Sequence, residues 1–288
     1  MKLRCLIIAA LLALAGCSSS GPDSVAGGSG AGNPGGVVAF SMRIDSSQAV
    51  FADRDELPVH PLSPDNRSSL PIIIENDDGL KFITDQVYVL VDNIRFVLGN
   101  SDQALSIDMD NYAPLYFDDE SFCLDGPFVC NVLSGTVEPS LEEIRVPDLR
   151  YKGVKISLKK DACTGECGLL KPSTIELRGT FRYEGEMHDF IISAATNITR
   201  FYKQESSSFS VDAGTVTRLL IDLDPRTWLE GVTIESCLAS GRLQFDISGA
   251  LVLDNKTGQE NCSNIAADIH TNIVQSGKLK VAKDKRKN

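Results

Sequence analysis

Acidic side chains form two clusters that could hold a metal ion or take part in hydrolysis. They are Asp108, Asp110, Asp118, Asp119 and Glu120 in one region, and Asp222 and Asp224 in another. Carboxylates gathered from loops are the usual ligands of Ca²⁺, although their spacing here is not that of an EF-hand. Calcium binding and simple solvation of charged loops are both compatible with this pattern. Asp118 and Glu120 could form a catalytic pair, but no nucleophile or base accompanies them in the sequence.

Histidine and the common catalytic motifs offer no further chemistry. The three histidines, His60, His188 and His270, share no metal-ligand spacing such as H-E-x-x-H. The sequence lacks C-x-x-C-H, G-x-S-x-G, a P-loop and a dinucleotide fingerprint. We therefore expect a protein that is not an enzyme and has no catalytic residue. We also expect no bound cofactor, unless the acidic clusters bind calcium.

Six cysteines downstream of Cys17 suggest disulfide bonds. Six cysteines allow fifteen pairings, and proximity in the sequence favours Cys123–Cys130, Cys163–Cys167 and Cys237–Cys262. The first two pairs enclose glycine-containing segments that read as turns. A metal site built from two cysteine pairs is the alternative, but the spacings are unusual and no histidine lies beside them. We expect disulfides, and hence an oxidising compartment.

Cys17 ends a segment that matches the bacterial lipobox. Lys2 and Arg4 precede a short apolar core at 6–14, which is well below the roughly twenty residues of a membrane-spanning helix. Leu14-Ala15-Gly16-Cys17 then supplies an aliphatic residue, two small residues and the thiol that takes the lipid. Residues 1–16 are therefore predicted to be a lipoprotein signal peptide. Cys17 is predicted to carry acyl chains, palmitate among them. An ordinary secretory signal is the alternative.

The residues after Cys17 read as a tether. Residues 17–36 are small, polar and rich in glycine and serine, a composition that buries no apolar surface. Ser18 occupies the position where Asp would favour the inner membrane, so the resemblance to sorted lipoproteins implies the outer membrane. Several acyl chains would give stable anchoring. No other stretch is apolar enough to cross a membrane, so the expected location is the cell envelope, attached by lipid.

The remaining composition narrows the class of partner. The formal net charge is −11 although Lys2, Arg4 and most of the 278–288 segment are basic, so the acidity lies between them. This argues against nucleic acid as a partner. We interpret 278–288 as a solvated basic tail, with contact to acidic partners or lipid headgroups as the alternative.

The body, residues 37–277, is expected to be mainly β, an antiparallel β-sandwich. Its length fits one large domain or two subdomains that divide near 140–150. Short segments with period-two alternation are separated by turn residues; the clearest are 37–44, 86–98, 151–158, 175–183, 188–194, 216–223 and 243–253. The alternation breaks at Asp92-Asn93, which predicts a bulge. Hairpins are expected at 184–187 and 212–214.

Two helices complete the expected fold. Asp224 and Pro225 predict a short helix near 225–230, with Asp224 as its N-cap. Isoleucines at 265, 269 and 273 predict an amphipathic helix near 261–276. Trp228 is the sole tryptophan, and we favour a place in the core over an exposed contact with a sugar or partner.

Three segments resemble a family of uncharacterised bacterial lipoprotein domains. They are VYVLVDNIRF at 87–96, YKGVKISL at 151–158 and VDAGTVTRLLIDLD at 211–224, within a region that covers about half of the chain. The resemblance implies an immunoglobulin- or transthyretin-like sandwich and no assigned activity. The six cysteines and the region of Trp228 are not part of the family's pattern.

Together these features predict a membrane-anchored envelope lipoprotein. Its body is expected to be a non-catalytic binding or structural module for an envelope protein or a polysaccharide. A glycan-active or hydrolytic enzyme that uses loop carboxylates is one alternative. A calcium-stabilised, adhesion-type domain is the other.

Overall fold

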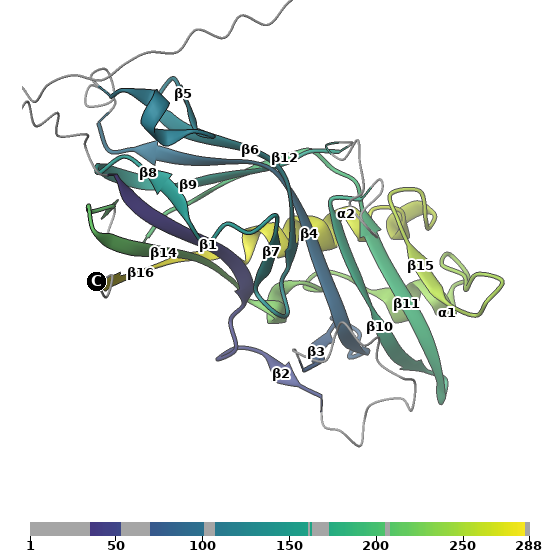
Figure 1. Ribbon diagram of the computed structural model, residues 1–288. Coiled ribbons are helices and arrows are strands. Elements are labelled where there is room, and N and C mark those ends of the chain that lie inside the picture. The colour runs from purple at the N-terminus through teal and green to yellow at the C-terminus, as the bar shows by residue number, and fades with distance from the viewer. Residues whose placement is uncertain are drawn as a thin grey trace, which may run out of the picture. The chain divides into compact units, whose positions relative to one another are not determined.

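A computed structural model describes residues 35–52, 70–100, 107–160, 162, 173–204 and 208–285. The prediction of a mainly β protein is confirmed, because strands dominate these residues and form two sheets. The small sheet has the order β16-β14-β1-β8, and Figure 1 shows it beside the large sheet. The predicted signal peptide, Cys17 and most of the tether lie outside the described residues.

The strands are more numerous than the sequence pattern indicated, and β4 is longer than the predicted 86–98. They are β1 (Gly36–Ile44), β2 (Val50–Phe51), β3 (Ile72–Glu75), β4 (Lys81–Leu98), β5 (Tyr116–Asp118), β6 (Ser121–Asn131), β7 (Thr136–Glu138), β8 (Ile144–Val146), β9 (Arg150–Leu158), β10 (Ile175–Tyr183), β11 (Glu186–Ala194), β12 (Ile198–Tyr202), β13 (Phe209–Ser210), β14 (Thr215–Leu223), β15 (Leu251–Leu253) and β16 (Lys278–Lys285). The helices are α1 (Ile234–Ala239) and α2 (Ile265–Gln275), with 3₁₀ turns η4 (Met109–Tyr112), η5 (Pro225–Thr227) and η6 (Glu260–Cys262).

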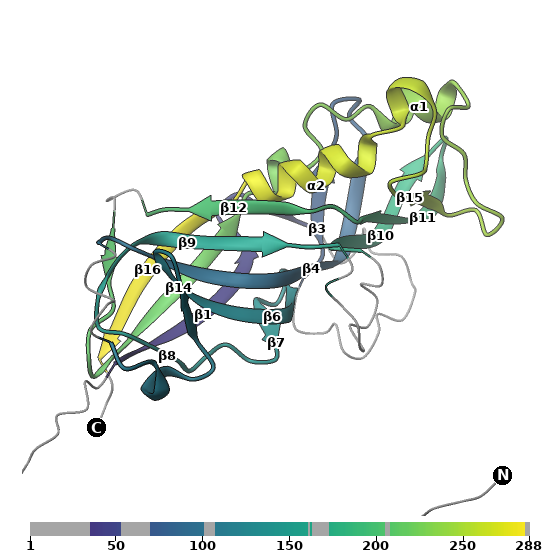
Figure 2. The same cartoon turned by 90° about the horizontal axis from the view of Figure 1, so that it is seen from above.

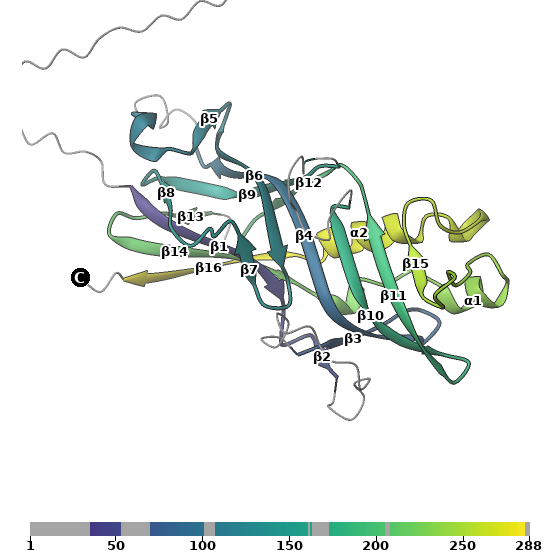
Figure 3. The same cartoon turned by 45° about the vertical axis from the view of Figure 1, so that its right-hand side comes forward.

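The long strand β4 organises the large sheet. Along one edge it pairs with β3 and then β6, and along the other with β10 and then β9. The predicted bulge is confirmed, since the register against β6 shifts between Val91 and Asn93. The extra residue lies on β6, where Asp125 and Phe128 flank Gly126-Pro127. Figure 3 shows β4 running between β6 and β10.

The core lies between the two sheets and beneath α2. In β1 the alternation places Phe40, Met42 and Ile44 inward, as period two requires. The preference for a buried Trp228 is confirmed: its side chain is fully buried, and its Nε1 donates to Ser276 Oγ at 3.1 Å. Helix α2 packs against β11 and η5, and Figure 2 shows it running alongside the strands of the large sheet.

The predicted helix ends and one hairpin are confirmed. Asp224 caps η5, because its side chain accepts from the backbone N–H of Arg226 and Pro225 follows it. The amphipathic helix forms at Ile265–Gln275, where Ile265, Ile269 and Ile273 are buried. Strands β10 and β11 form the expected hairpin, whose turn at Glu184-Gly185 places both residues at positive φ.

Three expectations for the second half of the chain are wrong. β13 pairs with β9 rather than with β14, so 212–214 connects the two sheets and does not close a hairpin. Only Leu251–Leu253 of the expected strand 243–253 is a strand. The basic tail is not frayed up to Lys285, because β16 pairs with residues 215–222 of β14. Lys280 and Lys283 contact acidic groups within the protein, which lowers the cost of packing a basic strand against an acidic body.

The body does not divide at 140–150. Strands from both sides of this region share each sheet: β1 lies between β8 and β14, and β4 lies beside β9 and β10. The pairing is antiparallel except for β1 with β14 and β11 with β15. In the described part of the chain, no helix is long and apolar enough to cross a membrane.

Candidate functional site

A cavity lies where β9 and β10 diverge from the same edge of β4. Asn93 of β4 pairs with Ser157 of β9, whereas Val89 pairs with Ile175 of β10. The sheet therefore splits between these two pairings. The small sheet faces this split from the other side of the core, and strand β12 and the last turn of α2 close it laterally.

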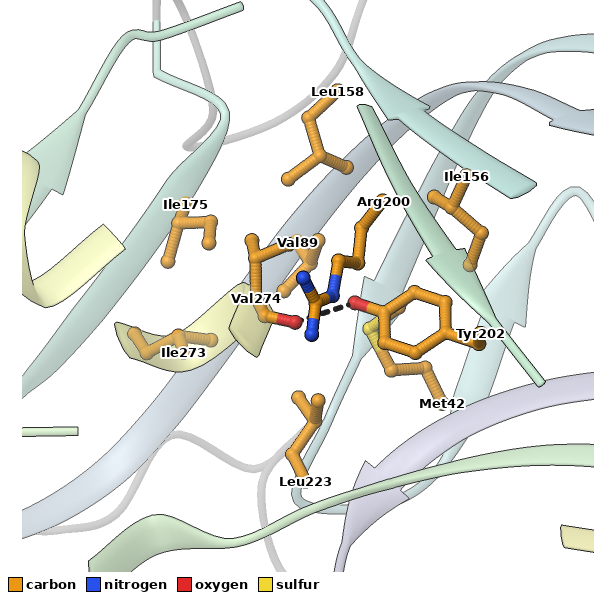
Figure 4. Close-up of a pocket in the computed structure, with 10 residues that line it drawn as sticks. All are labelled: Met42, Val89, Ile156, Leu158, Ile175, Arg200, Tyr202, Leu223, Ile273 and Val274. Atoms are coloured by element: carbon orange, nitrogen blue, oxygen red, sulfur yellow. Dashed lines mark hydrogen bonds between the residues drawn. The ribbon is translucent and has the colours of Figure 1, made fainter. Parts of the chain in front are cut away.

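The walls of the cavity are almost entirely aliphatic. The lining residues are Met42, Val89, Ile156, Leu158, Ile175, Arg200, Tyr202, Leu223, Ile273 and Val274, shown in Figure 4. The cavity between them is about 10 Å³, room for about one water molecule. Ligand pockets of ~300–1000 Å³ are usual. A ligand larger than water therefore enters only if the lining side chains move apart.

Arg200 brings the only positive charge to this lining. Arg200 lies in the same row of β12 as Ile198 and the buried Tyr202, but it is itself exposed, so it stands at the mouth of the cavity; Figure 4 shows its side chain beside the aliphatic groups. Within the described ranges, none of the ion pairs includes Arg200. Its guanidinium therefore has hydrogen-bond donors to offer to an anion.

Tyr202 fixes the wall of the cavity beside Arg200. Its hydroxyl donates to the backbone carbonyl of Val274 at 2.8 Å, which ties β12 to the last turn of α2. Burial raises the pKa of Tyr202, so the phenol remains a donor at any ordinary pH. A Cβ at Gly277 would lie 2.6 Å from the Tyr202 ring. The glycine therefore allows the chain to leave α2 close to this ring.

The structure does not bring the predicted acidic ligands together. Asp108 caps η4, where its Oδ1 accepts from the backbone N–H of Asp110 at 3.2 Å. Asp118 pairs with Arg95 at 2.9 Å, and Glu120 lies 3.9 Å from Lys152. Among the residues that the structure describes, no group of three or more His, Cys, Asp or Glu is arranged to hold a metal ion. Asp119 lies in the exposed turn between β5 and β6.

The second acidic cluster is used for structure. Asp222 is buried on β14 and pairs with Arg43 of β1 at 3.2 Å and with Lys280 of β16. Asp224 pairs with Arg226 at 2.7 Å in addition to capping η5. Both carboxylates are therefore neutralised by cations of the same protein. Asp222 joins three strands and Asp224 caps η5, and neither lines the cavity beneath β12.

One predicted disulfide is confirmed and one is wrong. Cys237 and Cys262 are bonded, with their Cα atoms 6.0 Å apart. Cys123 and Cys130 are free and buried. They lie on one continuous strand, β6, rather than across a turn, and seven residues of extended chain span about 23 Å. Cys163 and Cys167 lie outside the described residues.

The free thiols and the histidines are not poised for catalysis. Burial raises the pKa of Cys123, and it raises that of Cys130 to about 12, so both remain unreactive thiols. His270 is buried in α2 between the hydroxyls of Thr174 and Thr196, and burial lowers its pKa to about 4. His188 stacks on Phe245 with ring centroids 4.3 Å apart. His60 lies outside the described residues.

A second, open groove lies on the outer face of the small sheet. Its floor includes Ala39 and Ser41 of β1 and Val216 of β14, and residues 134–143 form one wall. Arg218, which also lines it, pairs with Asp284 at 2.5 Å. The groove therefore offers no cation without a partner, in contrast to the cavity beneath β12.

No family model matches the chain, and no curated protein or solved structure is detectably similar to it. The resemblance to uncharacterised lipoprotein domains therefore stays a prediction.

The sequence reasoning missed Arg200 because it missed β12. The five residues ITRFY follow closely on β11, and their alternation of Ile198, Arg200 and Tyr202 contains a charge in an otherwise apolar row. Because of that charge, a search for apolar periodicity does not detect the strand. An arginine that alternates with Ile198 and Tyr202 in a short strand is the signal that could have drawn attention to this position.

Proposed function

We propose that this protein is a lipid-anchored envelope lipoprotein whose β-sandwich body is a non-catalytic binding module. The proposed ligand site is the cavity beneath β12. The observation that carries the proposal is the combination of aliphatic walls with the guanidinium of Arg200, which has no ion-pair partner in the described residues. Aliphatic walls with a polar group at the mouth are typical of an apolar binding site; this cavity, of about 10 Å³, must widen to admit a ligand.

The arrangement of the reactive side chains supports binding over catalysis. Asp118 and Asp222 are held in ion pairs, and the thiol of Cys130 is buried with a raised pKa. None of these groups lines the cavity. The anchoring part of the proposal rests on the lipobox ending at Cys17.

The binding site can be tested with a neutral apolar fluorophore such as N-phenyl-1-naphthylamine. The full chain carrying Cys17→Ser would be titrated, so that no attached lipid competes. We expect saturable binding that is lost in Val274→Phe, because the larger side chain fills the cavity from α2. Ile247→Phe adds the same ring to a fully exposed loop position and serves as the matched control. Equal binding by all three proteins would contradict the assignment of the site.

A further inference from the structure

The open groove on the outer face of the small sheet is large enough to be a binding site. Its volume is about 810 Å³, within the ~300–1000 Å³ that is usual for ligand pockets. Ala39 and Ser41 provide small side chains at its floor, because the alternation of β1 turns the intervening Phe40 toward the core. A ligand can therefore enter the groove without the side-chain movement that the cavity beneath β12 requires.

The charges around the groove do not balance. Glu138, Glu142 and Glu143 line it and are exposed. Within the described ranges, none of the ion pairs includes these three carboxylates. Arg218 also lines the groove, but its charge is neutralised by Asp284. Three negative charges without counter-charges favour a cationic ligand.

A metal ion is not the cation that this wall fits. Among the residues that the structure describes, no group of three or more His, Cys, Asp or Glu is arranged to hold a metal ion. The three glutamates therefore line the groove without converging on one point. Lysine and arginine side chains, each with its own charge and its own donors, suit carboxylates arranged in this way.

The backbone of β1 has a free acceptor and a free donor at the edge that borders this wall. The N–H of Phe40 donates to the carbonyl of Leu141 at 2.8 Å, and further along the strand the N–H of Ile44 donates to that of Val132 at 3.2 Å. Alternate residues of a strand direct their backbone groups to the same edge, so the carbonyl of Phe40 and the N–H of Met42 lie between these two bonds. In the part of the chain that the structure describes, neither group forms a hydrogen bond.

This pair of groups favours a peptide as the occupant of the groove. A C=O and the N–H two residues later on one strand edge are the groups to which a single residue of a neighbouring parallel strand bonds. Phe40 lines the groove although its side chain is in the core, so its backbone is what the groove exposes. Addition of an extended peptide to such an edge is a common mode of recognition.

We infer that the groove binds an extended segment of a partner protein that is rich in lysine or arginine. One residue of this segment bonds the carbonyl of Phe40 and the N–H of Met42. Its basic side chains, about 7 Å apart along one face of an extended chain, lie against the glutamates of the wall. The groove is separate from the cavity beneath β12, so this inference adds a protein partner to the proposed binding module and does not depend on the apolar ligand.

The test titrates a short fluorescent peptide of alternating lysine and threonine with the full chain carrying Cys17→Ser, and it measures fluorescence anisotropy. We expect saturable binding that weakens as salt is added. The triple variant Glu138→Gln, Glu142→Gln, Glu143→Gln should bind the peptide about tenfold more weakly, because it removes three ion pairs of modest strength. Binding equal to that of the parent protein would overturn the inference.

A matched control removes the same charge elsewhere. The triple variant Glu186→Gln, Glu230→Gln, Glu235→Gln changes three exposed glutamates that do not line the groove, and it should bind the peptide as the parent does. An equal loss in this control would show that the peptide senses only the net charge, which would contradict the assignment of the groove. Circular dichroism checks that each variant is folded.

Two further ligands test the strand pairing. The same peptide with every backbone nitrogen methylated keeps the charges but cannot donate to Phe40, and a chitosan oligomer supplies cationic groups on a polysaccharide. We expect both to bind at least tenfold more weakly than the unmodified peptide. If either binds as tightly, the groove is an acidic surface without peptide recognition and the inference is overturned. Ala39→Phe, which fills the floor, should abolish peptide binding, whereas Ile247→Phe should not.

Discussion

Lys280 of the last strand forms an ion pair with Asp222, whose side chain is only 2 % exposed. The same carboxylate accepts from Arg43, so one buried anion joins β1, β14 and β16. Lys280 also lies 3.5 Å from Asp45, and its pKa is raised, first by the hydrogen bond to Asp222. The basic C-terminal segment is therefore part of the sandwich, fixed by acidic groups at the end of the small sheet.

Replacing Lys280 by Gln should lower the free energy of unfolding by about 1–2 kcal/mol, because the buried Asp222 would keep only Arg43 as its partner. Urea denaturation measures this change. Lys278→Gln, on the same strand, removes an exposed lysine for which no ion pair occurs in the described residues, and it should change stability by less than ~0.5 kcal/mol. Equal effects of the two variants would show that the ion pair with the buried Asp222 contributes no more to stability than an exposed lysine does.

His270 should make stability depend on pH in acid. Its pKa in the folded protein is about 4, below the ordinary value of 6.5, so the unfolded chain binds the proton first. Stability is therefore fully present above pH 6.5 and is lost as the pH falls toward 4, by about 3 kcal/mol from this residue. His270→Gln should flatten the pH profile of urea midpoints in this window. A profile that stays as steep as in the parent protein would contradict the assignment.

The Cys237–Cys262 disulfide should stabilise the C-terminal region. It closes a loop with a sequence separation of 25, for which chain entropy predicts about 3 kcal/mol. The Cys237→Ser, Cys262→Ser double variant should therefore have a lower melting temperature, and reduction of the parent protein should have the same effect. Cys130→Ala tests the other assignment: the melting temperature of this variant should respond to reduction as that of the parent protein does.

Acylation of Cys17 is predicted by the lipobox. Cells given labelled palmitate should incorporate the label into the parent chain and not into Cys17→Ser. The variant should also be lost from the membrane fraction, in which the acylated parent protein is found. Cys5→Ser, in the signal segment, is the control and should keep the label. Label that persists in Cys17→Ser would contradict the anchoring part of the proposed function.

Local sequence patterns predicted the elements whose own residues determine them. Three patterns were each sufficient to predict their own element: the isoleucines of α2, the alternation of β1 and the Asp224-Pro225 start of η5. Failures occurred where partners distant in the sequence decide the structure. The lysine-rich β16 becomes a strand because β14 supplies a ladder and Asp222 a counter-charge.

The segment FCLDGPFVC, residues 122–130, is a second case in which the local pattern predicted the wrong structure. Gly126 and Pro127 read as a turn that would bring two cysteines together. In the structure they form a bulge, and β6 continues against β4 on both sides of it. A Cβ on Gly126 would lie 2.5 Å from the carbonyl oxygen of Val91, so the glycine allows the close approach of the two strands. Tertiary pairing, which no local pattern contains, decides between the two outcomes.

The candidate site was the hardest part to predict. Its residues come from seven elements that meet only in the folded protein, and most of them are ordinary core aliphatics. Only Arg200 carries a charge, and its role depends on its place in β12, at the mouth of the cavity beside the buried Tyr202. The sequence clusters that looked most reactive, such as Asp118 and Glu120, proved to be surface ion pairs.

Methyl NMR of isoleucine-labelled protein tests the central claim most directly. Ile156, Ile175 and Ile273 line the cavity, whereas Ile247 is fully exposed on a loop. On addition of N-phenyl-1-naphthylamine, the account predicts saturable shifts of the three cavity isoleucines and none at Ile247. Shifts at Ile247 with unchanged cavity isoleucines would contradict it, because the probe would then be bound at the surface and not beneath β12.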